Sequence, residues 1–411
     1  MNNILSSDEI RACTSCQMCA AVCPVNAISI HLDSDGFYRP TVDNVKCVGC
    51  GFCRKVCYKY DREIKLTDED FLAKTTLLAA SAKDDAVVSD TTSGGIADLL
   101  AHKLIEEGYQ CIGVVYDATH SSAYDCIAST SEQVLAFRGS KYIQSYTENA
   151  FKELVRTCRE KRFAVFGTPC HIYAIDRFLK LKGLRENCLL IDLYCHGCPS
   201  LLIWQKYIYE VQTHISGQNI TDVKFRSKAR GWGSGNYVIE IVSDSGKYIS
   251  SRSNKFYNLF FSDLLLNSSC QSCQLRSTLA YTDIRLGDFW GKRYVANTRG
   301  VSAVSLVSQA GQNLFDRILP DLNCTQESYG NFLPYQSWNK TYHFSEKLRS
   351  QLLDQIRDKS VPLKKSVQTI YRNQTLRQRL KRYAKQGINL LPDTVIRKIK
   401  AYRSFRVLKS L

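Results

Sequence analysis

The sequence lacks a long uninterrupted apolar run: no segment approaches the ~20 apolar residues that a bilayer-spanning helix needs. Residues 1–11 contain neither a basic stretch nor an apolar core, so we expect no signal peptide. The chain nevertheless contains 18 cysteines. Without an export signal, these favour a reducing cytoplasm, where thiolates serve metals or catalysis rather than disulfides. We therefore predict a cytoplasmic protein, and 411 residues suffice for two or three domains.

Outside its C-terminal end, the chain also lacks net charge. Residues 340–411 contain 19 Lys or Arg and four Asp or Glu, so they carry +15 of the total of +16, and the other 339 residues carry +1. The basic character therefore belongs to the tail. Since no motif that reads bases accompanies this charge, we expect no nucleic-acid partner.

What the sequence does contain is two tandem cysteine runs with the spacing of bacterial ferredoxins. They read Cys13-x2-Cys16-x2-Cys19-x3-Cys23-Pro24 and Cys47-x2-Cys50-x2-Cys53-x3-Cys57. In this pattern three thiolates of one run reach one 4Fe-4S cluster, and the fourth binds the other cluster. We predict one cluster on Cys13, Cys16, Cys19 and Cys57, and a second on Cys47, Cys50, Cys53 and Cys23. Disulfides and structural zinc are the alternatives, and the tandem spacing disfavours both.

The chain divides into four predicted regions. A ferredoxin-like domain at 1–60 is followed by a connector at 61–90 with room for one helix, a body at 91–335 and a basic, mainly helical region at 336–411. Between the cysteine runs, alternating apolar residues at 28–32 and a turn at Asp35-Gly36 predict a short hairpin.

The body alternates strands, cysteine-bearing loops and helices, which indicates an α+β fold with an α/β-like body. The expected elements are helices at 96–107 and 171–181, and strands at 111–116, 163–166, 189–194, 237–242 and 247–250.

Two loops of the body suit phosphate groups. Ser93-Gly94-Gly95 precedes a helix, where free backbone N–H groups and the helix dipole attract anions, although an ordinary N-cap is the simpler interpretation. The loop from Arg138 to Tyr142 offers two cations, a hydroxyl and an aromatic ring, which suits a pyrophosphate next to a ring system; a solvated loop fits equally.

Five further cysteines follow or flank expected elements: Cys170, Cys195, Cys198 and the pair Cys270-x2-Cys273. Strand ends are where α/β proteins build sites, and this set suits a third cluster or a zinc ion. The remaining cysteines fit buried apolar positions better; they are Cys111, Cys126, Cys158, Cys188 and Cys324.

A cysteine hydrolase is a less favoured alternative. The pairs Cys170-His171 and Cys195-His196 are adjacent in sequence, and adjacent residues do not face each other on a helix. The segment 283–291 gathers acids, aromatics and glycines, but its spacing assigns it no role.

Taken in order, several motifs resemble the coenzyme F420 hydrogenase/dehydrogenase beta-subunit family over about 90–335. They are Thr92-Ser-Gly-Gly95, Gly139-Ser-Lys-Tyr142, Gly167-Thr-Pro-Cys170, Cys195-His-Gly197, Pro199-Ser200, Phe225-Arg-Ser-Lys228 with Gly231-Trp232, Cys270-x2-Cys273 and Gly287-Asp-Phe-Trp-Gly291. The resemblance implies a flavoprotein that passes electrons between iron–sulfur clusters, FAD and a hydride-carrying substrate, which is coenzyme F420 in archaeal members.

By motif, the implied FAD contacts are Ser93, Gly94, Gly95, Ser140, Lys141, Tyr142, Gly167 and Thr168. The implied ligands of a third 4Fe-4S cluster are Cys170, Cys195, Cys270 and Cys273. We expect an oxidoreductase with a redox partner protein or ferredoxin and a small-molecule or saccharide-linked substrate, in bacterial polysaccharide biosynthesis. A non-catalytic electron-transfer subunit and a structural metalloprotein are the competing classes.

The tail alternates apolar and basic residues at helical spacing. Leu376, Leu380 and Tyr383 precede a second series: Ile396, Ile399, Tyr402, Phe405 and Leu408. A basic amphipathic helix suits an anionic membrane surface. Packing of the apolar stripe on the body is slightly favoured over this peripheral membrane contact.

Overall fold

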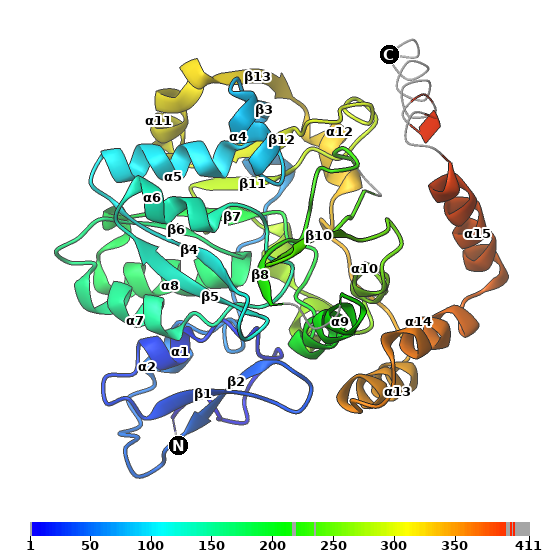
Figure 1. Cartoon of the computed structure of the whole chain (residues 1–411). Coiled ribbons are helices and arrows are strands. Elements are labelled where there is room, and N and C mark those ends of the chain that lie inside the picture. Colours follow the sequence, from blue (N-terminus) through cyan, green and yellow to red (C-terminus); the bar gives the residue numbers. More distant parts are fainter. Residues whose placement is uncertain (1, 216–218, 234–235, 392–394, 397, 399–411) are drawn as a thin grey trace.

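The structure, a computed structural model, describes residues 2–215, 219–233, 236–391, 395, 396 and 398. A small N-terminal module lies against a body built on a mixed sheet, and helices of the C-terminal region lie on the opposite side of the body's small sheet (Figure 1). The predicted fold class, α+β with an N-terminal ferredoxin-like part and a helical tail, is confirmed.

The module contains the expected hairpin between its cysteine runs. Strands β1 (Ile28–Leu32) and β2 (Tyr38–Val42) pair antiparallel, with Ile28 opposite Val42. The Asp33 carboxylate closes the turn, because its Oδ1 accepts the N–H groups of Asp35 and Phe37 at 3.0 and 2.9 Å. Short helices follow each cluster loop: α1 (Met18–Ala21) and α2 (Phe52–Lys55).

The body is organised on an eight-stranded sheet of order β13-β3-β12-β11-β7-β6-β4-β5. Its inner strands β4, β6, β7 and β11 are parallel, and the remaining pairings are antiparallel. The strands are β3 (Thr76–Ala82), β4 (Gln110–Asp117), β5 (Ser122–Ala128), β6 (Phe163–Phe166), β7 (Cys188–Leu193), β11 (Ile284–Asp288), β12 (Ser302–Leu306) and β13 (Leu322–Glu327).

Helices cover both faces of this sheet, as the side-chain period of two along a strand requires. Ala164 points to the face covered by α5 (Ile96–Glu106) and α11 (Gln309–Ile318), while Phe163 and Val165 point to the face covered by α7 (Glu148–Thr157) and α8 (Pro169–Lys182). Met18 and Val56 of the module pack into that second core, so the module is docked on α7 and α8.

The segment expected as a connector, 61–90, contributes an interior strand of the sheet. It contains α3 (Glu69–Ala73), β3 and α4 (Asp85–Asp90), and β3 pairs with both β12 and β13. Its alanine-rich sequence has little intrinsic strand preference, so pairing on both sides decides its conformation. The predicted limits of the regions stay predictions.

A second sheet of three strands and a helical layer complete the body and the tail. The strands are β8 (Ile220–Lys224), β9 (Glu240–Ser243) and β10 (Gly246–Ile249); β9 begins three residues later than expected. The helices are α9 (Leu201–His214), α10 (Lys255–Phe260), α13 (Glu346–Arg357) and α14 (Leu363–Arg372). Shorter helices are α6 (Ser131–Val134), α12 (Tyr329–Phe332) and the 3-10 turns Leu135–Phe137, Arg185–Asn187, Ser268–Cys270, Gln274–Ser277, Leu319–Asp321 and Leu333–Tyr335.

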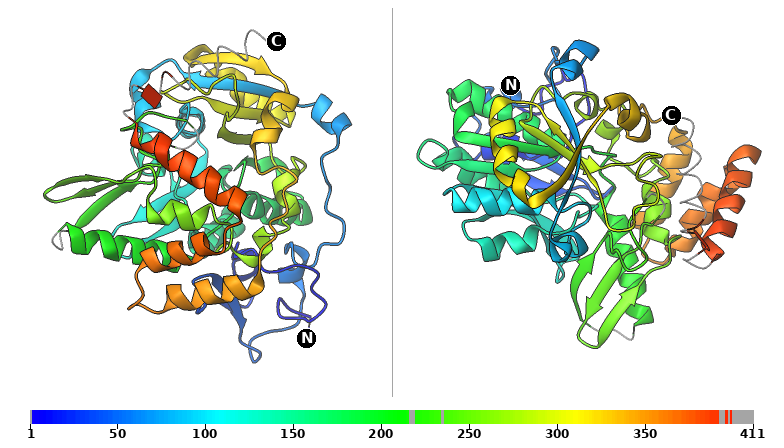
Figure 2. Two further views of the ribbon diagram at one scale, coloured as in Figure 1. Left: turned by 90° about the vertical axis from the view of Figure 1, so that its right-hand side faces the viewer. Right: turned by 90° about the horizontal axis from the view of Figure 1, so that it is seen from above.

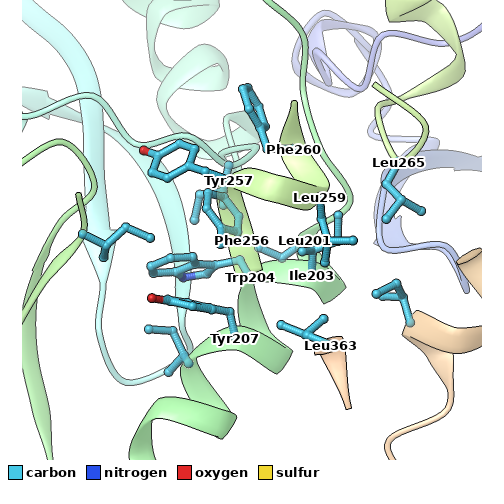
Figure 3. Packing of buried hydrophobic residues seen from close by; sticks show 14 of the residues in the cluster. Leu201, Ile203, Trp204, Tyr207, Phe256, Tyr257, Leu259, Phe260, Leu265 and Leu363 are labelled. Carbon is cyan, nitrogen blue, oxygen red and sulfur yellow. The ribbon is translucent and has the colours of Figure 1, made fainter. Parts of the chain in front are cut away.

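The helical layer surrounds the buried indole of Trp204 on α9. Figure 3 shows this ring beside Tyr207 and Phe256, with Leu363 of α14 on the same core. The ring centroids of Trp204 and Phe225 lie 4.3 Å apart. Through this aromatic core α13 and α14 belong to the body.

Helix α15 (Leu376–Leu390) extends beyond this layer (Figures 1 and 2). Leu376, Leu380 and Tyr383 are 74%, 61% and 60% exposed, so the favoured expectation that this stripe packs on the body is wrong for α15. Ile396 is buried, and Ile399, Tyr402, Phe405 and Leu408 lie outside the described residues. In the described part of the chain, no helix has the length and apolar character needed to cross a membrane.

Candidate functional site

The two cysteine loops of the module fold in the same way. In the first loop Ser15 and Gln17 have φ values of 64° and 61°, and in the second loop Gly49 and Gly51 have 66° and 70° at the equivalent positions. These left-handed residues precede α1 and α2 and turn the backbone around a common centre. Glycine adopts this conformation without strain, which explains Gly49 and Gly51.

The first predicted ligand set converges on one space. Cys13, Cys16, Cys19 and Cys57 all line an apolar cavity of about 20 Å³. Burial raises the pKa of the Cys19 thiol well above its usual value, and the neighbouring thiols of Cys16, Cys57 and Cys13 raise it further. The N–H of Ser15 points to Cys13 Sγ at 3.4 Å, a bond that stabilises a thiolate.

The second set lies closer to the surface. Burial and the nearby Cys50 and Cys23 raise the pKa of Cys53 to about 11, while Cys50 itself is exposed. The N–H of Ala27 donates to Cys23 Sγ at 3.2 Å, and Asn3 Nδ2 lies 3.8 Å from Cys47 Sγ. The donors suit two cubane clusters.

Within the described ranges, no three His, Cys, Asp or Glu side chains converge as ligands of a single ion. A cubane does not need such convergence, since each of its four cysteines binds a different iron atom.

The largest cavity, of about 1430 Å³, opens at the carboxyl ends of the parallel strands. Gly167 follows β6, Tyr194 follows β7 and Asp288 ends β11, and all three line it. This edge of the sheet is where open α/β folds bind ligands. Seven of the eight predicted FAD contacts line the cavity: Ser93, Gly95, Ser140, Lys141, Tyr142, Gly167 and Thr168.

Gly94 does not line the cavity. A Cβ at this position would lie 2.3 Å from the carbonyl oxygen of Ala80 on β3. Its N–H donates to Ser302 Oγ at 2.9 Å, and its carbonyl accepts the Ala82 N–H at 2.7 Å. The absence of a side chain therefore lets the 92–95 loop lie against the sheet, which makes Gly94 a positioning residue.

Two helices begin at the cavity wall without a side-chain cap. Gly95 is the N-cap of α5 and Thr168 is the N-cap of α8, and neither helix has a side-chain hydrogen bond to its first turn. The first N–H groups of each helix and the positive ends of both helix dipoles therefore remain available for an anion in the cavity.

The two loops that were expected to contact a flavin are bonded to each other. The Ser140 N–H donates to Thr92 Oγ1 at 2.8 Å, and Arg138 makes two 2.8 Å bonds to the carboxylate of Asp98 on α5. Lys141 directs its ammonium to three carbonyl oxygens, those of Ala136, Phe137 and Arg138, at 2.9–3.1 Å. Burial lowers the pKa of Lys141 to about 8.

A buried arginine organises the aromatic wall of the cavity. The Arg226 guanidinium donates to Tyr142 Oη and to Asp288 Oδ2, both at 3.2 Å, and lies 4.3 Å from the ring centroid of Tyr237. Trp232 Nε1 donates to Asp288 Oδ1 at 3.0 Å, which fixes this carboxylate. Tyr142 and Asp288 line the cavity, so this network sets the position of its walls.

The body's five loop cysteines gather on one side of the cavity: Cys170, Cys195, Cys198, Cys270 and Cys273. Burial and the adjacent Cys270 raise the pKa of Cys195 to about 12, and burial and Cys273 raise the pKa of Cys270 to about 11. The Cys198 N–H points to Cys270 Sγ at 3.4 Å. Buried thiols of raised pKa are poor free nucleophiles, whereas metal coordination deprotonates them.

This cysteine group adjoins the module. Burial raises the pKa of Cys170, and the neighbouring thiol of Cys16, a predicted ligand of the first cluster, raises it further. Tyr58 accepts the Gln274 N–H at 2.9 Å, directly after Cys273. Gln17, beside Cys16, bonds Ser145 O and the N–H groups of Thr147 and Glu148.

The geometry gives no thiol–imidazole pair of the kind a cysteine hydrolase needs among the residues that the structure describes. His196 bonds Asp263 Oδ1 at 2.7 Å and Ser337 Oγ at 3.0 Å. His171 packs edge-on against Phe151, and burial lowers its pKa to about 4.

Comparison with known proteins agrees with these findings. Residues 160–329 match the family of the C-terminal part of the coenzyme F420 hydrogenase/dehydrogenase beta subunit, and residues 12–59 match a 4Fe-4S dicluster domain. This chain joins a coenzyme F420 hydrogenase/dehydrogenase beta-subunit domain to a 4Fe-4S dicluster domain. The resemblance drawn from its motifs is confirmed.

Among the relatives of this F420 hydrogenase/dehydrogenase beta-subunit-like chain is a subunit of the F(420)H(2) dehydrogenase of Methanosarcina mazei, which is 21% identical over 351 residues, 81% of this chain and 92% of the relative. The beta subunit of the coenzyme F420 hydrogenase of Methanococcus voltae is 22% identical over 274 residues, 61% of this chain and 89% of the relative. A structure of the F420-reducing [NiFe] hydrogenase complex from Methanosarcina barkeri aligns with a TM-score of 0.45 and 18% identity, over 72% of this chain and 90% of that one.

The F420 hydrogenase/dehydrogenase beta-subunit-like chain is therefore an iron–sulfur oxidoreductase subunit, and its dicluster domain implies two 4Fe-4S clusters. The ligand and flavin-contact assignments stay predictions. Three features escaped the sequence interpretation: the Arg226–Asp288 pair, the Asp98–Arg138 pair and the contact between Cys16 and Cys170. Charged residues inside the aromatic segments 225–228 and 287–291 were the available signal for the first pair.

Proposed function

We propose that this subunit moves electrons between the two clusters of its module and an FAD in the large cavity, and onward to a substrate that enters the same cavity. One observation carries the proposal. The body's cysteine group lies in the wall of the cavity and, at Cys170, beside Cys16 of the module.

FAD fits the cavity on three counts. The two uncapped helix N-termini, at Gly95 and Thr168, supply donors for a pyrophosphate. Tyr142 and Trp290 supply aromatic surface for a ring system. The cavity's volume of about 1430 Å³ exceeds that of typical ligand pockets, so it has room for a flavin and a second molecule.

A third 4Fe-4S cluster fits the body cysteines. Cys170, Cys195, Cys270 and Cys273 would be its ligands, and Cys198 Sγ lies near enough to Cys270 to replace one of them. Arg276 lies beside this group: its charge opposes the rise in the pKa of Cys195 and would partly neutralise thiolates. Donor chemistry and burial both suit a cluster.

When bound, a flavin accepts a hydride and exchanges single electrons with clusters. The chain's own residues then hold and shield it. Arg226 keeps Tyr142 and Asp288 in the cavity wall, and Asp98 holds Arg138 so that the 138–142 loop stays against the 92–95 loop. These bonds fix the walls before any ligand enters.

For the partner, we propose a small electron-carrier protein that docks at the second cluster. Cys50 is exposed, and Val45 and Val48 beside Cys47 are 97% and 66% exposed. Redox encounters use small interfaces of this kind. The substrate we propose is a small or saccharide-linked molecule, and bacterial polysaccharide biosynthesis is the proposed setting.

The test is anaerobic reconstitution of the full chain, followed by iron, sulfide and flavin quantitation. We expect about twelve iron atoms and about one FAD per chain. Cys270→Ser should remove about four iron atoms and leave the module's clusters, whereas the matched control Cys324→Ser on β13 should remove none. Zinc in place of iron, or a Cys270→Ser protein with unchanged iron, would contradict the third cluster.

A non-catalytic electron-transfer subunit is the second candidate. It is favoured by one observation: both of these relatives are themselves subunits of enzymes. Full cluster content without bound FAD, together with retained electron transfer to a dye, would support this candidate over the flavoenzyme.

A further inference from the structure

Helix α15 presents an apolar stripe that nothing in the described chain covers. At 3.6 residues per turn, Leu376, Leu380 and Tyr383 fall on one face, with Arg377 on one side of the stripe and Arg379 on the other. These three apolar side chains are 60–74% exposed. A soluble helix normally buries such a stripe, so its exposure calls for an occupant.

The opposite face of α15 attaches the helix to the body. The Arg382 guanidinium lies 4.1 Å from the ring centroid of Tyr371 on α14, and Arg379 Nη2 donates to the Arg372 carbonyl at 2.8 Å. Helix α14 in turn buries Leu363 and Val367 in the aromatic core. The stripe is therefore held outward by a structured mount (Figures 1 and 2).

The charge around the stripe has one sign. Residues 359–391 contain nine Lys or Arg and no Asp or Glu. A second copy of the chain would place this charge against itself, which disfavours self-association through the stripe. An anionic bilayer attracts such a segment at about 1 kcal/mol for each Lys or Arg near its surface and accepts apolar side chains without a matching groove.

We propose that α15 docks this subunit on an anionic membrane surface, with Leu376, Leu380 and Tyr383 inserted at the level of the lipid headgroups. The inference does not depend on the flavin or the third cluster. It requires only the exposed stripe, its flanking cations and its attachment to α14.

The experiment is vesicle co-sedimentation of the full-length, cluster-loaded protein. The probes are vesicles of phosphatidylcholine alone and of phosphatidylcholine mixed with phosphatidylglycerol. We expect sedimentation with the mixed vesicles only, and release by added salt. Leu380→Glu should weaken binding about tenfold because it removes apolar insertion and adds a negative charge. Leu319→Glu, an equal charge change at a 44% exposed site on the body, should stay within about twofold of the wild type.

Several outcomes would overturn the proposal. Wild-type protein that stays in solution with the mixed vesicles would do so. Binding that Leu380→Glu leaves unchanged would reduce the helix to a non-specific cation and remove the stripe from the account. A dimer in light scattering that Leu380→Glu dissociates, without vesicle binding, would identify a second copy as the occupant. Soluble polyglutamate that binds as tightly as the vesicles would indicate an acidic protein partner instead.

Discussion

The molecule gathers cysteines in two different ways. In the module, all eight lie between Cys13 and Cys57, and two matching loops close around their centres by local backbone conformation alone. In the body, Cys170, Cys195 and Cys270 come from three separate elements, and the eight-stranded sheet brings them together. Local spacing therefore specifies the first arrangement, whereas the second depends on every contact that aligns β6, β7 and the 268–277 segment.

The largest test of this difference removes a buried charge beneath the body's cavity. Asp192 on β7 and Arg285 on β11 form an ion pair whose side chains are both 2% exposed. Asp192→Asn leaves Arg285 buried without its counter-ion, which should lower the free energy of unfolding of the body by about 3–5 kcal/mol. Anaerobic urea titration would follow tryptophan fluorescence, because all four tryptophans lie in residues 204–338.

In that titration the cluster absorption of the module should unfold at higher urea than the tryptophans of the variant. The control Glu106→Gln, which breaks an exposed pair with Lys103, should cost no more than about 1 kcal/mol. Equal shifts of both signals in Asp192→Asn would refute the independence of the module.

The next test concerns a carboxyl group at the junction between the two regions. Asp125 on β5 is buried, its N–H bonds Tyr146 O, and no cation among the described residues pairs with it. Burial raises the pKa of Asp125 to about 7, an effect that the Ser145 hydroxyl only partly opposes. The folded chain thus holds a proton that the unfolded chain loses above about pH 4.

The unfolding free energy should therefore fall as the pH rises from about 4 to about 7, since the folded state binds more protons in this window. Asp125→Asn should remove that slope and stabilise the protein by about 2–4 kcal/mol above pH 7. Denaturation series at several pH values would measure it, with Asp321→Asn at an exposed position as the control. A slope that persists in Asp125→Asn would assign the titration to another group.

A third test loosens the module from the body. The Gln17 side chain makes three bonds to the 145–148 segment, at 2.9–3.1 Å and fully buried. Gln17→Ala leaves these backbone groups unsatisfied and should cost about 2–3 kcal/mol. Electron transfer from module to body should slow while total iron stays the same, measured by stopped-flow absorption. Gln309→Ala, which removes one exposed bond, is the control; an unchanged transfer rate in Gln17→Ala would mean that the docking does not need this residue.

The smallest test addresses the loop on the flavin side. Gly94→Ala puts a methyl group against the Ala80 carbonyl and should destabilise the body by about 1–3 kcal/mol and reduce retained flavin. Gly387→Ala on α15 meets no atom within 4 Å and should stabilise its helix by up to about 1 kcal/mol. Gel-filtered protein would be assayed for flavin and thermal stability. Full flavin retention in Gly94→Ala would argue against a role for this loop.

Sequence patterns predicted those elements whose periodicity is strong. The hairpin at 28–42, the helix from Ile96 and the strands at 163–166 and 188–193 all follow from alternation and turn residues. Strand β3 escaped because alanine carries little strand preference, and only its pairing with β12 and β13 makes it a strand. The exposure of Leu376 escaped because a helical stripe gives no information about whether a partner exists.

The sequence by itself determined the chemistry of this protein: the Cys-x2-Cys-x2-Cys-x3-Cys runs specify cluster-forming loops, because all the ligands of a run lie within a few residues. Only the tertiary structure decided which distant groups meet. It placed Cys170 beside Cys16, joined Arg226 to Asp288 across 62 positions of sequence, and turned the stripe of α15 outward. The physical reason is that these contacts arise from sheet order and core packing, which no local pattern encodes.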